Sequence, residues 1–201
     1  MKRGKYIFLT GAPGSKWSSV ARSIWYSQDV DRSDDKNEYS DGNVRHQGAY
    51  WGPGMEYGDK FSVMYLQSKE ELEAEFDRPF SGTGVRIIKC HNFAVQLNFI
   101  RENWPDCPIV MCDRGDDACL GWWVKAGGFD ITYPNYSHYK NFKLMGVNIA
   151  NQNSGIRSFV AYKPHYRVFN SNEMCSLLGI ENSIINQDYF NDDINVYLNW
   201  S

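Results

Sequence analysis

The fold is decided by the stretch Lys5-Tyr-Ile-Phe-Leu-Thr-Gly-Ala-Pro-Gly-Ser-Lys-Trp-Ser-Ser19. Its first part, Lys5–Thr10, is short and almost continuously apolar, which is typical of a strand buried in a parallel sheet. Glycine and proline then interrupt the run, and apolar residues return at helical spacing at Val20, Ala21, Ile24 and Trp25. The stretch therefore predicts a strand, a glycine-containing loop and a helix, in that order.

The loop after this strand has the components of an anion site. It resembles the nucleotide-binding pattern G-x-x-x-x-G-K-[ST], without the glycine that precedes the lysine. Gly11 and Gly14 allow a tight turn with inward N–H groups, the next helix offers its N-terminus, and Lys16 adds positive charge. An ordinary glycine-containing turn with a surface lysine is the alternative. The residues expected to contact the anion are Gly11, Pro13, Gly14, Ser15, Lys16, Trp17, Ser18 and Ser19.

Strands and helices are predicted to alternate further along the chain. The expected strands are Val85–Cys90, Pro108–Cys112 and Ile194–Trp200. The expected helices are Lys69–Phe76, Asn92–Asn103, Asp116–Ala126, Tyr139–Val160 and Asn172–Leu178. This alternation predicts an α/β protein with a three-layer, P-loop NTPase-like fold and a central parallel sheet. We expect one domain over residues 1–201, with a polar loop insertion at about residues 29–60.

Charge and cysteine content exclude several classes of function. The chain has 201 residues and a formal net charge of -3, which argues against a nucleic-acid partner. Its five cysteines include no C-x-x-C pair, and their spacing relative to histidine does not suggest a zinc site, so we expect no metal. No signal peptide and no apolar run of membrane-spanning length are seen, so we expect a reducing, cytoplasmic location without a membrane partner.

Two later segments narrow the range of possible functions. The first expected strand after the insertion ends in Lys89-Cys90-His91, and the next is followed by Arg114 and then by Trp122-Trp123. In their order and separation from the loop, these motifs resemble the PAPS-dependent sulfotransferases, over roughly residues 5–27 and 85–127. Gly14 stands where that family usually has lysine or arginine, and its carboxy-terminal nucleotide pattern is not found.

The resemblance implies a cofactor and roles for individual residues. The cofactor is PAPS, which becomes adenosine 3′,5′-bisphosphate, and no metal is required. His91 is the expected catalytic base, Lys16 stabilises the leaving phosphate, and Arg114 binds the 3′-phosphate. The family's serine after the arginine corresponds to Trp122 here, or to Gly121 if one residue is deleted, so both are assigned to the cofactor site.

The acceptor site is expected in a glycine-rich, aromatic segment of the insertion. Aromatic rings together with a carboxylate suit a hydroxylated or cationic small molecule or glycan. A loop that packs its own aromatic residues as a lid is an equally good interpretation. The candidate acceptor-binding residues are His46, Tyr50, Trp51, Glu56 and Tyr57.

Other functions stay open on the sequence alone. A small-molecule or nucleotide kinase would use ATP and magnesium through Lys16, Ser18 and Asp113, although Asp113 also suits a helix-capping role. A non-catalytic nucleotide-binding domain is the third hypothesis. His91 is alternatively a histidine bonded to backbone at a strand end, and Arg114 alternatively pairs with a nearby aspartate at the surface.

Overall fold

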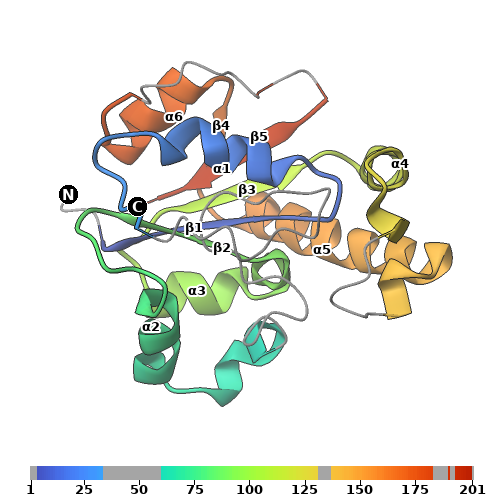
Figure 1. Ribbon diagram of the computed structural model, residues 1–201, viewed down its shortest axis with the longest axis horizontal. Coiled ribbons are helices and arrows are strands. Elements are labelled where there is room, and N and C mark those ends of the chain that lie inside the picture. Colours follow the sequence, from blue (N-terminus) through green and yellow to red (C-terminus); the bar gives the residue numbers. More distant parts are fainter. Residues whose placement is uncertain (1–3, 34–59, 131–136, 183–189, 191–192, 201) are drawn as a thin grey trace.

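The computed structural model describes residues 4–33, 60–130, 137–182, 190 and 193–200. Within these ranges five strands form one sheet in the order β2-β1-β3-β5-β4, with helices on both faces (Figure 1). The strands are β1 Tyr6–Gly11, β2 Arg86–Lys89, β3 Ile109–Asp113, β4 Tyr166–Val168 and β5 Asn195–Asn199. The α-helices are α1 Trp17–Trp25, α2 Lys69–Asp77, α3 Leu97–Asn103, α4 Asp116–Lys125, α5 Phe142–Tyr162 and α6 Ser171–Leu178. Short 3₁₀ helices are η2 Lys60–Leu66, η3 His91–Val95, η4 Gly128–Asp130 and η5 Ser137–Tyr139.

The sheet is mixed, with a parallel centre. β1 lies between β2 and β3 and is parallel to both, with Leu9 opposite Lys89 on one side and Val110 on the other. The expected parallel sheet is therefore confirmed for these three strands. It is wrong for β5, which runs antiparallel to β3 and pairs Met111 with Tyr197, and β4 runs antiparallel to β5. An apolar run pairs in either direction, so the residues of β5 did not reveal its orientation.

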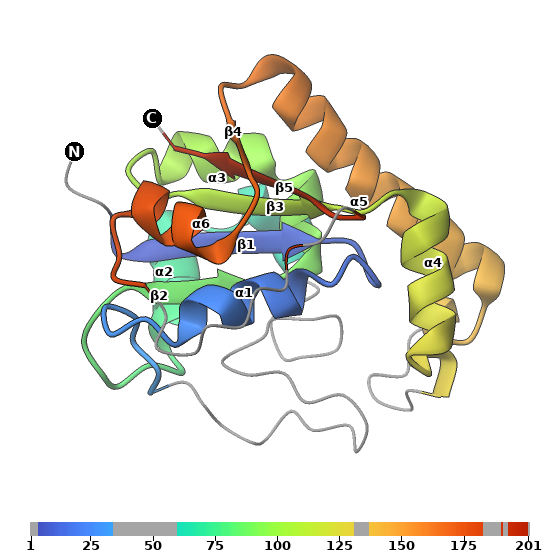
Figure 2. The same cartoon turned by 90° about the horizontal axis from the view of Figure 1, so that it is seen from above.

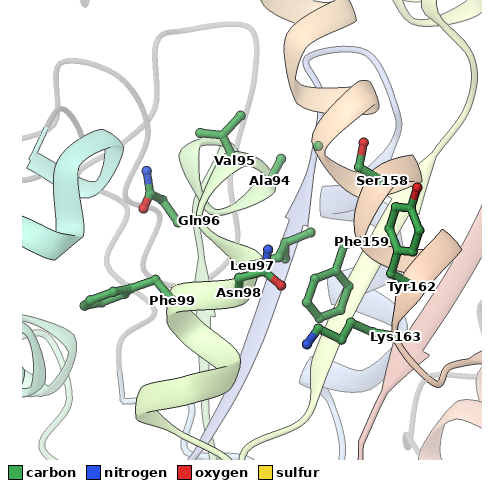
Figure 3. A pocket seen from close by; sticks show the side chains of 11 residues that line it. Ala94, Val95, Gln96, Leu97, Asn98, Phe99, Ser158, Phe159, Tyr162 and Lys163 are labelled. Carbon is green, nitrogen blue, oxygen red and sulfur yellow. The ribbon is translucent and has the colours of Figure 1, made fainter.

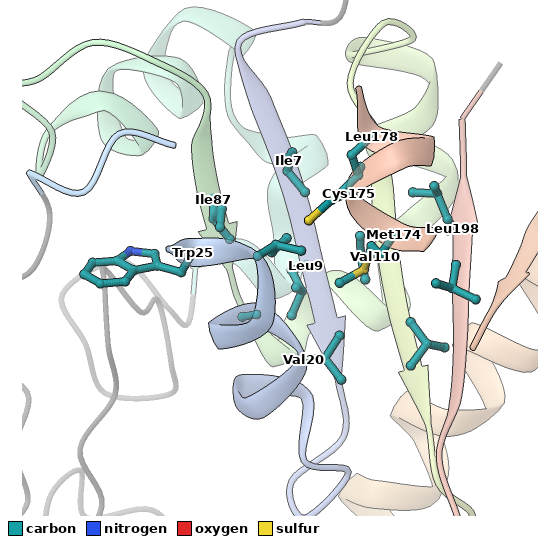
Figure 4. Close-up of a cluster of buried hydrophobic side chains, with 14 of the residues drawn as sticks. Ile7, Leu9, Val20, Trp25, Ile87, Val110, Met174, Cys175, Leu178 and Leu198 are labelled. Carbon is teal, nitrogen blue, oxygen red and sulfur yellow. The ribbon is translucent and has the colours of Figure 1, made fainter. Parts of the chain in front are cut away.

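The two faces of β1 bury different side chains because neighbouring residues of a strand point to opposite sides. Ile7 and Leu9 face α1 and α6, where they join a buried hydrophobic cluster (Figure 4). Phe8 lies on the other face and contacts Phe76 and Trp104, with ring centroids 5.4 Å apart in each pair. The expected α/β architecture, with helices on both sides of the sheet, is confirmed (Figure 1).

Helix boundaries follow local capping chemistry. α2 begins with a capping box, in which the Ser68 hydroxyl accepts from the Glu71 N–H and the Glu71 carboxylate accepts from the Ser68 N–H. α6 begins one residue earlier than expected, because Asn170 accepts from the Glu173 N–H and acts as the cap. The helix expected over 92–103 is divided into η3 and α3.

The carboxyl ends of the parallel strands meet at one edge of the sheet, and α4 lies beyond that edge (Figure 2). Ala12, in the loop after β1, packs with Cys119, Met145 and Ile149 in a small buried cluster. This cluster joins the loop to α4 and α5. Ligands bind at this edge in open parallel sheets. The candidate site is therefore expected at the ends of β1, β2 and β3.

The described helices and cysteines give two further findings. Among the residues that the structure describes, no helix is both long and apolar enough to span a membrane. All five cysteines are buried free thiols. Burial raises the pKa of Cys119 to about 11, so this thiol beside the loop is protonated near neutral pH.

Candidate functional site

The loop after β1 is tightly built and contains one strained residue. The Ser15 N–H donates to the Ala12 carbonyl over 3.0 Å, and Gly14 adopts φ +81°. Lys16, just before α1, has φ +62° and is the one non-glycine residue with positive φ among those described. This conformation costs roughly 1–2 kcal/mol for a residue with a side chain. Such strain is concentrated at functional sites, and here it falls on the lysine expected to bind an anion.

Lys16 and Arg114 converge on one carboxylate. Arg114, which follows β3, donates from Nε to Asp193 Oδ2 over 2.9 Å, and its Nη2 contacts the same oxygen. Lys16 Nζ lies 3.6 Å from that oxygen. Arg114 Nη1 also donates to the Gly14 carbonyl over 3.3 Å, which links the ends of β1 and β3. Arg114 thus pairs with Asp193, far along the chain, and not with a nearby aspartate as the alternative interpretation expected.

The pKa of Asp193 reflects these contacts. Partial burial alone would raise the pKa, but the hydrogen bonds from Arg114 and the charges of Arg114 and Lys16 hold it below its ordinary value. Asp193 is therefore ionised at neutral pH, and its carboxylate marks a position where two cations accommodate a single anionic oxygen.

Trp122 lies beside the same cations. Its ring centroid is 4.8 Å from Lys16 Nζ, 5.4 Å from Arg114 Cζ and 5.6 Å from Lys125 Nζ. Its side chain is partly exposed at 36%. Trp123 is instead partly buried and packs against Phe129 and Tyr139. The two neighbouring tryptophans therefore have different surroundings, Trp122 beside the cations and Trp123 beside other aromatic rings, because adjacent helical residues point in different directions.

His91 contacts the residues at the two ends of the loop, Gly11 and Trp17. Its Nδ1 is hydrogen-bonded to the Gly11 carbonyl, and its ring lies 4.6 Å from that of Trp17. A carbonyl oxygen only accepts, so Nδ1 must carry the proton and, in the neutral ring, Nε2 carries the lone pair. Thr10 Oγ1 donates to the Cys90 carbonyl over 2.8 Å and ties the end of β2 to β1. His91 is almost fully buried.

Asp113, the carboxylate considered for magnesium, is engaged by protein groups. Arg157 donates to both of its oxygens, over 2.8 and 3.0 Å, and the Gly115 N–H donates to Oδ1 over 3.0 Å. The hydrogen bond to Asp113 raises the pKa of Arg157 above its ordinary value, so the guanidinium stays protonated throughout the physiological range. The bond from Gly115 holds Asp113 in the turn before α4, but the N-cap of α4 is Gly115 itself and no side chain caps this helix, so Asp113 is not its capping residue.

The remaining expected residues vary in accessibility. Ser15 is fully buried, and its hydroxyl has no hydrogen-bond partner among the described residues. Pro13 is buried, whereas Ser18 and Ser19 are half-buried on the first turn of α1. Gly121 is exposed on α4, and a Cβ there would meet nothing within 4 Å. The acceptor candidates His46, Tyr50, Trp51, Glu56 and Tyr57, like most of the insertion, lie outside the described residues.

A separate hollow of about 430 Å³ lies between α5 and the η3–α3 segment (Figure 3). Leu97 and Phe159 line it together with polar residues such as Gln96, Ser158 and Lys163. No residue of the expected anion site lines this hollow. Over the described ranges, no three His, Cys, Asp or Glu side chains gather as potential metal ligands.

Sequence reasoning missed three charged residues of the site. Lys125 was detectable in principle, because it lies three residues after Trp122 on the same helix. Asp193 and Arg157 had no such signal, since 79 residues separate Arg114 from Asp193 and 44 separate Asp113 from Arg157. Only the folded chain brings these side chains to the ends of β1 and β3.

Comparison with known proteins adds no relative to this description: no protein-family model, no curated protein and no solved structure matches the chain.

Proposed function

We propose that the chain is a P-loop-type sulfotransferase that moves a sulfuryl group from PAPS to a hydroxyl or amine of a small-molecule or glycan acceptor. The observation that carries this proposal is the convergence of Lys16 and Arg114 on one oxygen of Asp193. Two cations from the ends of adjacent parallel strands provide an oxyanion site at the edge of the sheet where ligands bind. PAPS is proposed as the sulfuryl donor because the order of the motifs along the chain resembles that of the PAPS-dependent sulfotransferases.

Lys16 and the loop supply positive charge in this proposal. Lys16 and the N-terminus of α1 stabilise the negative charge that develops on the departing phosphate oxygen. Arg114 binds the 3′-phosphate with its planar set of donors, and the exposed ring of Trp122 provides an aromatic surface close by. Because these groups already bear the charge, the proposal requires no metal ion.

His91 accepts the acceptor's proton. PAPS supplies the sulfuryl group, and its bond from sulfur to the phosphate oxygen breaks as the acceptor oxygen or nitrogen bonds to sulfur. The electron pair of the broken bond leaves with the phosphate, and the acceptor proton passes to His91 Nε2. The bond from Nδ1 to the Gly11 carbonyl supports this role, because it fixes the orientation of the ring and assigns the Nδ1 proton to that bond.

The kinase alternative receives less support from the same geometry. It requires a carboxylate at the end of β3 to hold magnesium, and both oxygens of Asp113 are bound by Arg157. A divalent cation would have to break that bidentate pair before Asp113 could act as its ligand.

Calorimetric titration tests the proposal directly. We expect adenosine 3′,5′-bisphosphate to bind with a Kd in the micromolar range, equally well with and without EDTA, and ATP with magnesium to bind at least about tenfold more weakly. Tight binding of ATP that disappears in EDTA would contradict the proposal and favour the kinase.

Arg114→Ala tests the contact with the 3′-phosphate. We expect the variant to lose more affinity for adenosine 3′,5′-bisphosphate than for adenosine 5′-monophosphate, by about tenfold. Arg167→Ala is the matched control, because Arg167 lies on the edge strand β4 and contacts Phe169. Equal losses for the two nucleotides would show that Arg114 does not recognise the 3′-phosphate.

A further inference from the structure

Asp193 occupies the point where the two cations of the loop edge converge. Arg114 and Lys16 both approach its Oδ2, and their side chains are only 11% and 18% exposed. The Asp193 side chain is 45% exposed, so it is the more accessible partner in both pairs. The Asp193 carboxylate therefore neutralises Lys16 and Arg114, whose side chains are mostly buried.

Stability alone gives little reason for this arrangement. An ion pair with an exposed partner contributes little to folding, because water screens the charges and two side chains lose freedom. Lys16 nevertheless holds a strained backbone conformation beside the pair. The strain at Lys16 and the weakness of its ion pair with Asp193 are better explained if another anion replaces Asp193 than if the contact is permanent.

We propose that Asp193 is an internal competitor, whose carboxylate holds the anion position until the phosphate group of a ligand displaces it. Asp193 is then a specificity-determining residue. A carboxylate tethered to the chain acts at an effective concentration on the order of millimolar, so a free singly charged anion gains nothing by replacing it. A phosphate dianion brings more charge and more acceptor oxygens to Lys16 and Arg114 and does displace it.

The competition itself follows from the contacts of Asp193, and only the identity of the phosphate-bearing ligand rests on the proposed function. Two probes separate these claims: inorganic phosphate, and adenosine 3′,5′-bisphosphate. Each is titrated into the wild-type chain, into Asp193→Asn and into Asp117→Asn. Asp117 is an exposed residue in the first turn of α4, so its variant makes the same change in net charge.

Asp193→Asn is expected to bind both probes at least about tenfold more tightly than the wild type, because the competing charge is gone. Asp117→Asn is expected to change either affinity less than about threefold, through long-range attraction alone. Acetate at the same ionic strength should weaken phosphate binding to Asp193→Asn but not to the wild type.

The outcomes distinguish the two proposals. If Asp193→Asn gains affinity for phosphate while neither variant nor the wild type binds the bisphosphate, Asp193 is confirmed as a competitor and the assignment of PAPS is wrong. If the bisphosphate binds every variant equally, the nucleotide assignment stands and the competitor is overturned. Weaker binding to Asp193→Asn also overturns it, because Asp193 would then position the cations rather than block them.

A measurement on the unaltered chain covers the case in which Asp193→Asn does not fold. The Arg114 Nε–H donates to Asp193 over 2.9 Å, so its ¹⁵N resonance reports this bond. Saturating phosphate is expected to shift the resonance, whereas chloride at equal ionic strength should leave it in place. A resonance that phosphate does not move would contradict displacement of Asp193.

Discussion

Arg157 on α5 holds Asp113 at the end of β3 through two hydrogen bonds, from Nε to Oδ2 over 2.8 Å and from Nη2 to Oδ1 over 3.0 Å. The same Nη2 donates to Asp116 Oδ1 over 3.0 Å. Asp113 and Asp116 flank Arg114 in the turn between β3 and α4. One guanidinium therefore restrains this turn on both sides of Arg114 by pairing with the two carboxylates that flank it.

Removing this guanidinium should weaken both the fold and the site. We expect Arg157→Ala to lower the free energy of unfolding by about 2 kcal/mol, less than a fully buried pair would lose because Arg157 is half exposed. Urea denaturation measures the change, with Lys143→Ala, an exposed cation on the same helix, as the control. Arg157→Lys should recover only part of the loss, because lysine lacks the planar fork. Equal stability of Arg157→Ala and the control would contradict the prediction.

Two glycines of the expected site should respond in opposite directions to alanine. A Cβ on Gly14 would lie 2.0 Å from the Cys119 carbonyl oxygen, and the residue has φ +81°. We expect Gly14→Ala to lower the free energy of unfolding by at least about 2 kcal/mol. Gly121→Ala meets no atom within 4 Å and lies in a helix, so we expect a gain of about 0.5–1 kcal/mol. Thermal unfolding compares the two, and a stable Gly14→Ala would show that the loop relaxes away from α4.

The strain at Lys16 is measurable by comparing two truncations. Lys16→Gly and Lys16→Ala remove the same charge, but only glycine adopts φ +62° without cost. We expect Lys16→Gly to be more stable than Lys16→Ala by about 1 kcal/mol, with equal loss of phosphate affinity in both variants. Chemical denaturation and phosphate titration give the two values. Equal stabilities would mean that the loop does not hold this conformation in solution.

His91 should affect turnover without affecting binding. We expect His91→Ala to lower the rate of adenosine 3′,5′-bisphosphate release from PAPS by about 10²–10⁴-fold, the usual contribution of a general base. Its Kd for the bisphosphate should stay within about twofold. His165→Ala is the control, because that side chain is exposed, lies on the far edge of the sheet against Tyr197, and bonds to the Lys163 carbonyl rather than to the loop after β1. Parallel losses of rate and affinity would identify His91 as a structural residue.

Acid sensitivity should depend on Asp77, which lies outside the candidate site. Burial alone would raise its pKa, but hydrogen bonds from Lys5, Arg86 and Tyr6 hold the pKa below its ordinary value. A lowered pKa contributes stability that is complete above about pH 4 and is lost as the pH falls through the folded-state value. Asp77→Asn should therefore show a flatter dependence of unfolding free energy on pH below about pH 4. Glu102→Gln, at an exposed position of α3, should keep the wild-type slope.

The sequence predicted those elements whose signal is local. The apolar run before Gly11 predicted β1, and the spacing of Val20 and Ile24 predicted α1, because a strand or helix facing a core repeats its apolar residues with its own period. β4 escaped prediction, since a strand of three residues with two exposed side chains has no such period. The predicted parallel sheet also implied that the ends of β1, β2 and β3 lie at one edge, because parallel strands share their carboxyl edge.

What the sequence determined by itself was therefore the order of the main strands and helices other than β4, and the residues at the strand ends, including Lys16, His91 and Arg114. Tertiary structure alone decided the direction of β5, the division of Trp122 from Trp123, and the partners of the charged groups. Lys16 and Arg114 pair with Asp193, and Asp113 with Arg157, across long stretches of chain. Such pairs have no local signature, because a charge is attracted to any opposite charge, and only the folded arrangement of the strands and helices determines which one lies within reach.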